Sequence, residues 1–353
     1  MVVQAPSFLE FTSYTFFCQT AALGVFFEYR DFIAWIECKD EYKSVPDPII
    51  PSLKWLGQSL TFLTIFAVMT PYIPIDYCWS DGFADHPFLW KVGFYWLAFT
   101  VKRSFYYSPF CATTGAICAC GLGYNGVKTV KDHEEHQWDK IIGVYWVECE
   151  RMTSPAEVFR YWNYQVHVWL KGYVYMRLIT PGQKPGTYES MMTFCISSLW
   201  HGFYVFYHIM FFFAACLQEL AKDIYKSHIL FKGVPKPVKV VTCWFFTYLT
   251  LNYCGINVVA LSLKNGLAFN AAMYYFVFIL ILVSLALFRF KIMPYARKLE
   301  KKLAGDKPTL KEELKQELND KSDKQEKKEA RKDRTVTIVQ EKKPQAPNVE
   351  KIE

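Results

Sequence analysis

Residues 190–218 of this 353-residue chain read SMMTFCISSLWHGFYVFYHIMFFFAACLQ and contain no Asp, Glu, Lys or Arg. Crossing the roughly 30 Å hydrocarbon core of a bilayer takes about 20 apolar residues in a helix. The stretch is long enough for one crossing. Because lipid offers the backbone no hydrogen-bond partner, and the sequence lacks the alternating pattern of barrel strands, we predict a helix.

Several other stretches have the same character. Residues 55–75, 104–127, 240–263 and 265–288 are also uncharged, and residues 11–27 and 86–101 are shorter or interrupted candidates. The chain is 52% hydrophobic and 18% aromatic. This composition excludes a soluble globular enzyme, a nucleic-acid-binding protein and a disordered protein as descriptions of the whole chain. We therefore predict an all-α, polytopic helical membrane protein.

The charged residues concentrate at the C-terminus. Residues 297–353 hold 17 Lys and Arg and 13 Asp and Glu, a density that cannot bury an apolar core. We predict a membrane-embedded core at 1–296 and a disordered or partly helical tail at 297–353. The tail is expected in the cytosol, because the loop 219–239 on the same side is also rich in Lys.

The eleven cysteines are an odd number without a paired spacing, and most lie in apolar stretches. Thiols in such places behave as small hydrophobic groups, so we expect them to be reduced. His133 and His136 lie three residues apart but lack further ligands at metal-site spacing. We predict no metal site, and a solvated polar loop at 133–136.

His201 is the polar residue that most needs an explanation, since a bilayer penalises ionisable groups. It lies near the middle of residues 190–218, where the one other imidazole is His208. Burial lowers the pKa of an imidazole, so a buried His201 is expected to be neutral and able to accept a proton. The following Gly202 leaves room for a substrate or a neighbouring helix. A histidine hydrogen-bonded between helices explains the same pattern, and the sequence alone leaves both open.

A second polar cluster lies in the aromatic stretch at residues 161–177. As a helix, this stretch places Asn163 and His167 on one face, and Trp162 and Trp169 on another. An uncharged amide can orient a bound carbonyl or hydroxyl. The alternative is an interfacial helix anchored by its aromatic and basic residues.

Together, residues 162–171 (WNYQVHVWLK) and 198–204 (SLWHGFY) resemble the signature of the membrane-bound O-acyltransferase family, in its lysophospholipid acyltransferase branch. Upstream stretches at 6–31, 103–107 and 121–148 resemble further family segments in the same order. The likeness covers about residues 6–292. Family members carry more helices before this region, so the chain is expected to lack the N-terminal helices of the family fold.

The resemblance implies a helical bundle around an intramembrane chamber, in a multi-pass protein of the endoplasmic reticulum. It implies transfer of a fatty acyl group from acyl-CoA to the hydroxyl of a lysophospholipid, in phospholipid remodelling. By the same resemblance His201 and Asn163 match the catalytic residues. Acyl-CoA is a co-substrate, no cofactor is implied, and the partners are the two substrates and the bilayer. The residues expected to bind substrate are Trp162, Trp169, Trp200, Gly202, Tyr204 and Arg103, and anchoring at the membrane edge explains Arg103 about as well.

Two other functions stay open on the sequence. One keeps the chemistry and changes the acceptor to a sterol, a diacylglycerol or a protein. The other is a non-catalytic membrane protein, such as a transporter or a scaffold. The head group, the acyl chain and the oligomeric state are not determined by the sequence.

Overall fold

The computed structural model describes residues 5–18, 25–130, 133–227, 231, 233–292 and 294–295. The chain divides into two units, residues 1–288 and residues 289–353. The predicted charged tail at 297–353 lies outside the described residues. The first unit contains the candidate site.

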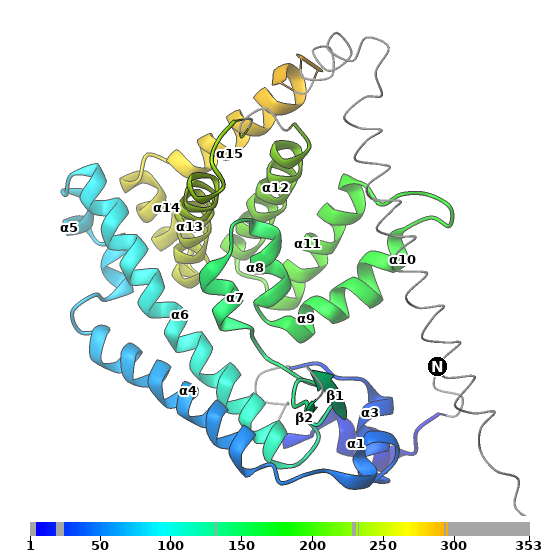
Figure 1. The fold of residues 1–353 in the computed structure, drawn as a ribbon. Coiled ribbons are helices and arrows are strands. Elements are labelled where there is room, and N and C mark those ends of the chain that lie inside the picture. Colours follow the sequence, from blue (N-terminus) through cyan, green and yellow to red (C-terminus); the bar gives the residue numbers. More distant parts are fainter. Residues whose placement is uncertain are drawn as a thin grey trace, which may run out of the picture. The chain divides into compact units, whose positions relative to one another are not determined.

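The first unit is mainly helical (Figure 1). Its α-helices are α1 (Phe8–Thr15), α3 (Tyr29–Ile36), α4 (Ile49–Met69), α5 (Asp81–Ala84), α6 (Phe88–Ala119), α7 (Trp146–Arg151), α8 (Pro155–Tyr161), α9 (Tyr164–Trp169), α10 (Met176–Leu178), α11 (Thr187–His201), α12 (Val205–Ser227), α13 (Lys236–Ala260), α14 (Leu263–Ala272) and α15 (Phe276–Leu287). The 3-10 helices are η1 (Asp40–Ser44) and η2 (Ile75–Trp79), and the π-helices are η3 (Leu170–Tyr175) and η4 (Phe288–Ile292).

One β-hairpin departs from the all-α prediction. Strands β1 (Val127–Val130) and β2 (His133–His136) pair antiparallel, with Val127 opposite His136. The strand β2 is exposed along its whole length, so its polar side chains are solvated as predicted, but on a strand rather than in a loop. A short hairpin can form within this helical unit because its two strands hydrogen-bond to each other and need no apolar face to pack.

Helices α4 and α6 pack along one another (Figure 1). Small residues permit the close approach: Ser59 and Ser108 hydrogen-bond across the interface at 3.2 Å. A Cβ on Gly115 would lie 3.2 Å from the Cβ of Trp55. Interfaces of this kind, with small residues and hydroxyl pairs, are typical of helices associating in lipid.

The largest hydrophobic cluster joins α6, α12, α13, α14 and α15. Rings fill the space that glycines leave open: a Cβ on Gly255 would lie 2.0 Å from the Phe99 ring, and one on Gly266 would lie 2.3 Å from the Phe206 ring. These positions therefore require glycine for packing rather than for backbone freedom. The cluster holds the helices around α12 together.

Two of the predicted membrane helices are interrupted. The stretch 190–218 is not a single helix, because α11 ends at His201 and α12 begins at Val205. The stretch 265–288 breaks between α14 and α15, which meet at 76°. Within the described part of the chain, Val205–Lys226 is long and apolar enough to cross a bilayer alone, and the bent pair would count as one broken span.

The outward side of these helices is apolar. Helix α4 exposes a row of aliphatic side chains: Ile49, Ile50, Leu53, Leu56, Leu60, Leu63, Ile65 and Val68. Helix α15 exposes Ile279, Leu280, Leu282, Val283 and Leu287. Contiguous apolar surface of this extent is unusual for a soluble monomer and is typical of a membrane contact.

A buried ion pair connects three helices. Arg103 of α6 donates to both carboxylate oxygens of Glu150 at 3.0 and 3.1 Å, and it also donates to Asn252 of α13. Tyr107 and Tyr248 donate to the same carboxylate. Burial by itself would raise the pKa of the Glu150 carboxyl, but the Arg103 charge and these hydrogen bonds leave that pKa below its usual range.

Replacing one member of this ion pair is expected to destabilise the fold. Arg103→Met leaves a largely buried carboxylate without its counter-charge, which costs about 2 kcal/mol once the partial exposure of Glu150 is allowed for. Thermal unfolding in detergent, followed by tryptophan fluorescence, should show a clearly lower midpoint.

The neighbouring substitution Lys102→Met is the matched control. Lys102 contacts the Phe105 ring at 4.2 Å and makes no hydrogen bond or ion pair to the residues that the structure covers. An equal loss of stability in both variants would show that the Arg103–Glu150 pair has no special role.

Candidate functional site

Asn163 lies at the junction between α8 and α9, not within a helix. Its backbone is left-handed, with φ +46° and ψ +59°, a region that Asn tolerates better than most residues. Its side-chain Oδ1 is buried and accepts no hydrogen bond from any residue in the described ranges. A buried acceptor without a partner is costly, and this makes the Asn163 amide a candidate for contact with a ligand.

Backbone hydrogen bonds on both sides hold this junction in place. The amide of Tyr145 donates to the Tyr161 carbonyl at 3.1 Å, and the amide of Tyr164 donates to the Gly143 carbonyl at 2.9 Å. The segment 143–145 is therefore hydrogen-bonded to the residues on either side of the junction 162–163. No local pattern in the sequence predicts this pairing, because helices α7 and α8 separate the two segments in the chain.

Trp162 fixes the junction against α6. Its ring packs at 5.7, 5.5 and 6.1 Å from the rings of Tyr106, Tyr107 and Phe110, measured between centroids. All three belong to α6. Trp162 is thus part of a buried aromatic cluster, and the backbone position of Asn163 is tied to α6 through it.

His201 is the last residue of α11. Gly202 caps the helix with φ +124° and ψ −178°, a conformation that residues with a Cβ avoid. The His201 ring lies 4.8 Å from Trp200, 5.9 Å from Tyr207 and 4.9 Å from Phe211. In the isolated chain the His201 side chain is nonetheless exposed. The expected deep burial in an unbroken helix is therefore wrong, because the helix ends at this residue.

Aromatic contacts join the surroundings of Asn163 and His201. Phe26 packs against Trp169 of α9 at 4.9 Å and against Trp200 of α11 at 5.9 Å. Phe26 therefore links α9 to the end of α11, and no hydrogen bond joins Asn163 and His201 directly within the described part of the chain.

His208 supports the helix pair from α12. Its Nδ1 lies 2.9 Å from the Ser198 Oγ on α11, and the Ser198 hydroxyl donates to the Cys195 carbonyl. Since a serine has a single proton, Nδ1 of His208 acts as the donor to Ser198. His208 is therefore occupied in holding α11 to α12, which leaves His201 as the imidazole without such a partner.

The remaining predicted residues have varied surroundings. Tyr204 is half exposed and packs at 5.6 Å from Tyr207, in the turn after Gly202. Arg103 is 4% exposed and its donors are used by Glu150, Asn252 and Thr100. The prediction that Arg103 contacts a substrate phosphate stays a prediction, while its observed contacts are structural. Sequence reasoning missed Phe26, Tyr106 and Tyr207.

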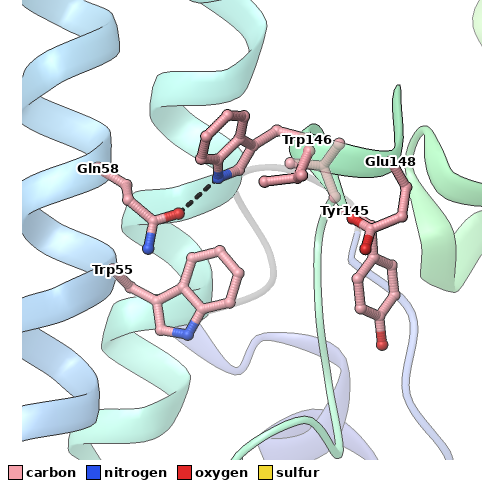
Figure 2. A pocket seen from close by; sticks show the side chains of 7 residues that line it. Trp55, Gln58, Tyr145, Trp146 and Glu148 are labelled. Carbon is pink, nitrogen blue, oxygen red and sulfur yellow. Dashed lines mark hydrogen bonds between the residues drawn. The ribbon is translucent and has the colours of Figure 1, made fainter. Parts of the chain in front are cut away.

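A cavity of about 260 Å³ lies beside this region, between α4 and the chain that enters α7 (Figure 2). Its walls include Trp55, Tyr145 and Trp146, and neither Asn163 nor His201 is among its lining residues. Within the described part of the chain, no group of three His, Cys, Asp or Glu side chains is arranged to hold a metal ion. The cysteines at 38, 78, 111, 118, 120, 149, 195, 243 and 254 form no disulfide within the described part of the chain.

Comparison with known proteins gives consistent matches. The family model described as MBOAT, membrane-bound O-acyltransferase family, matches residues 1–264. The lysophospholipid acyltransferase of Schizosaccharomyces pombe is 29% identical over 315 residues, which cover 84% of this chain and 60% of that protein. The lysophospholipid acyltransferase 2 of Arabidopsis thaliana is 27% identical over 285 residues, which cover 78% of this chain and 60% of that protein.

A more distant relative is the membrane-bound glycerophospholipid O-acyltransferase 1 of Mus musculus. It is 23% identical over 297 residues, which cover 79% of this chain and 58% of the mouse protein. The chain thus spans about three-fifths of the length of these relatives.

The helix break at residue 202 yields a prediction about stability. Gly202→Ala places a Cβ on a backbone with φ +124° and is expected to lower the free energy of unfolding by about 1–3 kcal/mol. Chemical denaturation of the purified chain in detergent measures the loss. In Gly172→Ala, the control, the added Cβ meets open space on a helical backbone, so stability should be unchanged or slightly higher. Equal losses in the two variants would contradict the importance of the break.

Proposed function

The chain belongs to the membrane-bound O-acyltransferase family, and from this premise we propose that it transfers a fatty acyl group from acyl-CoA to the free hydroxyl of a lysophospholipid in the endoplasmic reticulum membrane. The observation that carries the proposal is the buried amide oxygen of Asn163 at the start of α9, which accepts no hydrogen bond from the described residues. The second proposed group, the His201 imidazole at the end of α11, likewise makes no hydrogen bond within the described ranges. The relatives named as lysophospholipid acyltransferases support this acceptor class.

The proposed reaction needs one proton acceptor and one orienting group. The acceptor oxygen attacks the thioester carbonyl, so that a C–O bond forms and the C–S bond breaks. His201 takes the hydroxyl proton and returns it to the departing CoA sulfur, which leaves as a thiol. No covalent acyl-enzyme is required, since the thioester is already activated.

The neighbours of His201 suit a general base. Its ring contacts are Trp200, Tyr207 and Phe211, with no carboxylate among them to hold the imidazole in its charged form. A neutral imidazole can accept a proton. The aromatic rings also exclude water from that side, which strengthens each hydrogen bond to a bound substrate.

Asn163 is suited to orienting a substrate. Its Oδ1 can accept a hydrogen bond from the acceptor hydroxyl, which would satisfy the oxygen that the described residues leave without a partner. The left-handed backbone and the clamp by Gly143 and Tyr145 fix the amide before substrate binds. Such preorganisation lowers the entropy cost of bringing thioester and hydroxyl together.

Loss of either group is expected to abolish most of the activity. Membranes that contain His201→Ala or Asn163→Ala should transfer labelled acyl groups to a panel of lysophospholipids at least about a hundredfold more slowly than wild type, the usual range for removing general-base catalysis. The assay measures labelled phospholipid by chromatography.

The control is His133→Gln, on the exposed strand β2, which should keep wild-type activity. All variants need equal amounts of protein in the membrane, measured by immunoblot. Labelled product at wild-type rates in both His201→Ala and Asn163→Ala would refute the mechanism. Transfer to a sterol, a diacylglycerol or a protein instead of a lysophospholipid would refute the acceptor.

A further inference from the structure

The cavity in Figure 2 has a composition that the proposed chemistry does not explain. It measures about 260 Å³ and opens between α4 and the N-terminal end of α7. Three of its seven lining residues are aromatic, two are valines, and one carries a charge. The lining residues are Trp55, Gln58, Val144, Tyr145, Trp146, Val147 and Glu148.

Contacts with neighbouring residues hold two of the aromatic walls, Trp146 and Tyr145, in place. The Trp146 indole donates from Nε1 to the Gln58 Oε1 at 2.5 Å, and its ring packs at 5.2 Å from Phe62. Tyr145 packs edge-on at 4.9 Å from Tyr164. The rings are therefore rigid before any ligand arrives, as an effective binding site requires.

Glu148 supplies the negative charge. Its side chain is exposed and makes no hydrogen bond or ion pair with any residue in the described ranges. Figure 2 shows its carboxylate on the same side of the cavity as Tyr145. Burial, followed by nearby charged groups that include Glu148, raises the pKa of Tyr145 to about 12. Tyr145 thus stays neutral, and Glu148 is the one charge on the wall.

We propose that this cavity binds a quaternary ammonium group, the choline head of the phospholipid acceptor. Quaternary ammonium ions are recognised by aromatic ring faces, which attract the cation without hydrogen bonds, and a nearby carboxylate adds to the attraction. A primary ammonium needs three hydrogen-bond acceptors, whereas these walls consist mostly of rings and valine side chains. The proposal rests on the proposed function, because it assigns the head group of the acceptor.

The place of the cavity fits this assignment. Tyr145 packs on Tyr164, which directly follows Asn163, and the Tyr164 amide bonds to Gly143. The wall of the cavity and the candidate catalytic amide therefore belong to one hydrogen-bonded segment.

A binding measurement tests the cavity without relying on turnover. The purified full chain, in an uncharged sugar-head detergent, is titrated with dodecylphosphocholine and with dodecylphosphoethanolamine, which share the same chain and phosphate. Wild type should bind the choline probe about tenfold more tightly. Glu148→Gln and Trp55→Leu should bring the ratio of the two dissociation constants close to one. Asp85→Asn, which removes an exposed charge directly after α5, should keep the wild-type ratio.

Competition by soluble salts identifies the chemical group that the cavity binds. Tetramethylammonium chloride should displace the choline probe from wild type, and the same concentration of sodium chloride should not. A wild-type ratio near one, a ratio that persists in both Glu148→Gln and Trp55→Leu, or equal displacement by the two salts would overturn the proposal.

The acyl-transfer assay separates this proposal from the one on which it rests. A choline preference in binding without acyl transfer to any lysophospholipid would leave the cavity as a quaternary ammonium site and refute the proposed function. Acyl transfer without a choline preference in binding would leave the proposed function and refute the cavity.

Discussion

The ion pair between Arg103 and Glu150 is the contact on which the arrangement of the site depends. An arginine with 4% of its surface exposed cannot remain in an apolar helix bundle without a counter-charge. Glu150 supplies that charge from α7, and Asn252 completes the contact from α13. Helix α7 follows the segment 143–145, and that segment brackets Asn163 by backbone hydrogen bonds. One buried ion pair therefore positions α7, and through α7 the segment 143–145 that holds the junction at Asn163.

The helical class, the membrane character and the family could be predicted from the sequence, because they depend on uncharged length and on two short motifs. What could not be predicted was where helices end. Residues 190–218 contain no charge, and yet Gly202 divides them between α11 and α12. Hydropathy measures the cost of burying side chains, whereas a helix break depends on one backbone conformation that a glycine can adopt. The same limitation explains the unpredicted bend between α14 and α15.

The sequence also predicted the roles of individual polar residues only in part. Arg103 was a candidate for a phosphate contact on its residue type, but its partner Glu150 lies 47 positions away and became visible only in the structure. The sequence shows His208 only as the second imidazole of an uncharged stretch, whereas the structure places it within hydrogen-bonding distance of Ser198 across the interface with α11. Phe26 lies in the stretch 6–31 that resembles a family segment, but its sequence indicates no role for it, and only the structure shows that it packs against Trp169 and Trp200. Contacts between distant segments are set by tertiary packing, which a local motif does not encode.

Asn163 and His201 share a feature that bears on the proposed chemistry: each lies at a helix boundary with left-handed backbone, at Asn163 itself and at Gly202 beside His201. Such conformations are costly and persist where surrounding contacts enforce them. At Asn163 these contacts are the Gly143 and Tyr145 hydrogen bonds and the packing of Trp162 on α6. At His201 they are the aromatic rings and the Ser198–His208 bond that holds α11 to α12. A side chain within a helix shares its face with the residues one turn away, whereas a side chain at a helix end points beyond the last turn. The breaks therefore place the amide and the imidazole at helix ends rather than on packed helix faces, as the proposed contact with a substrate requires.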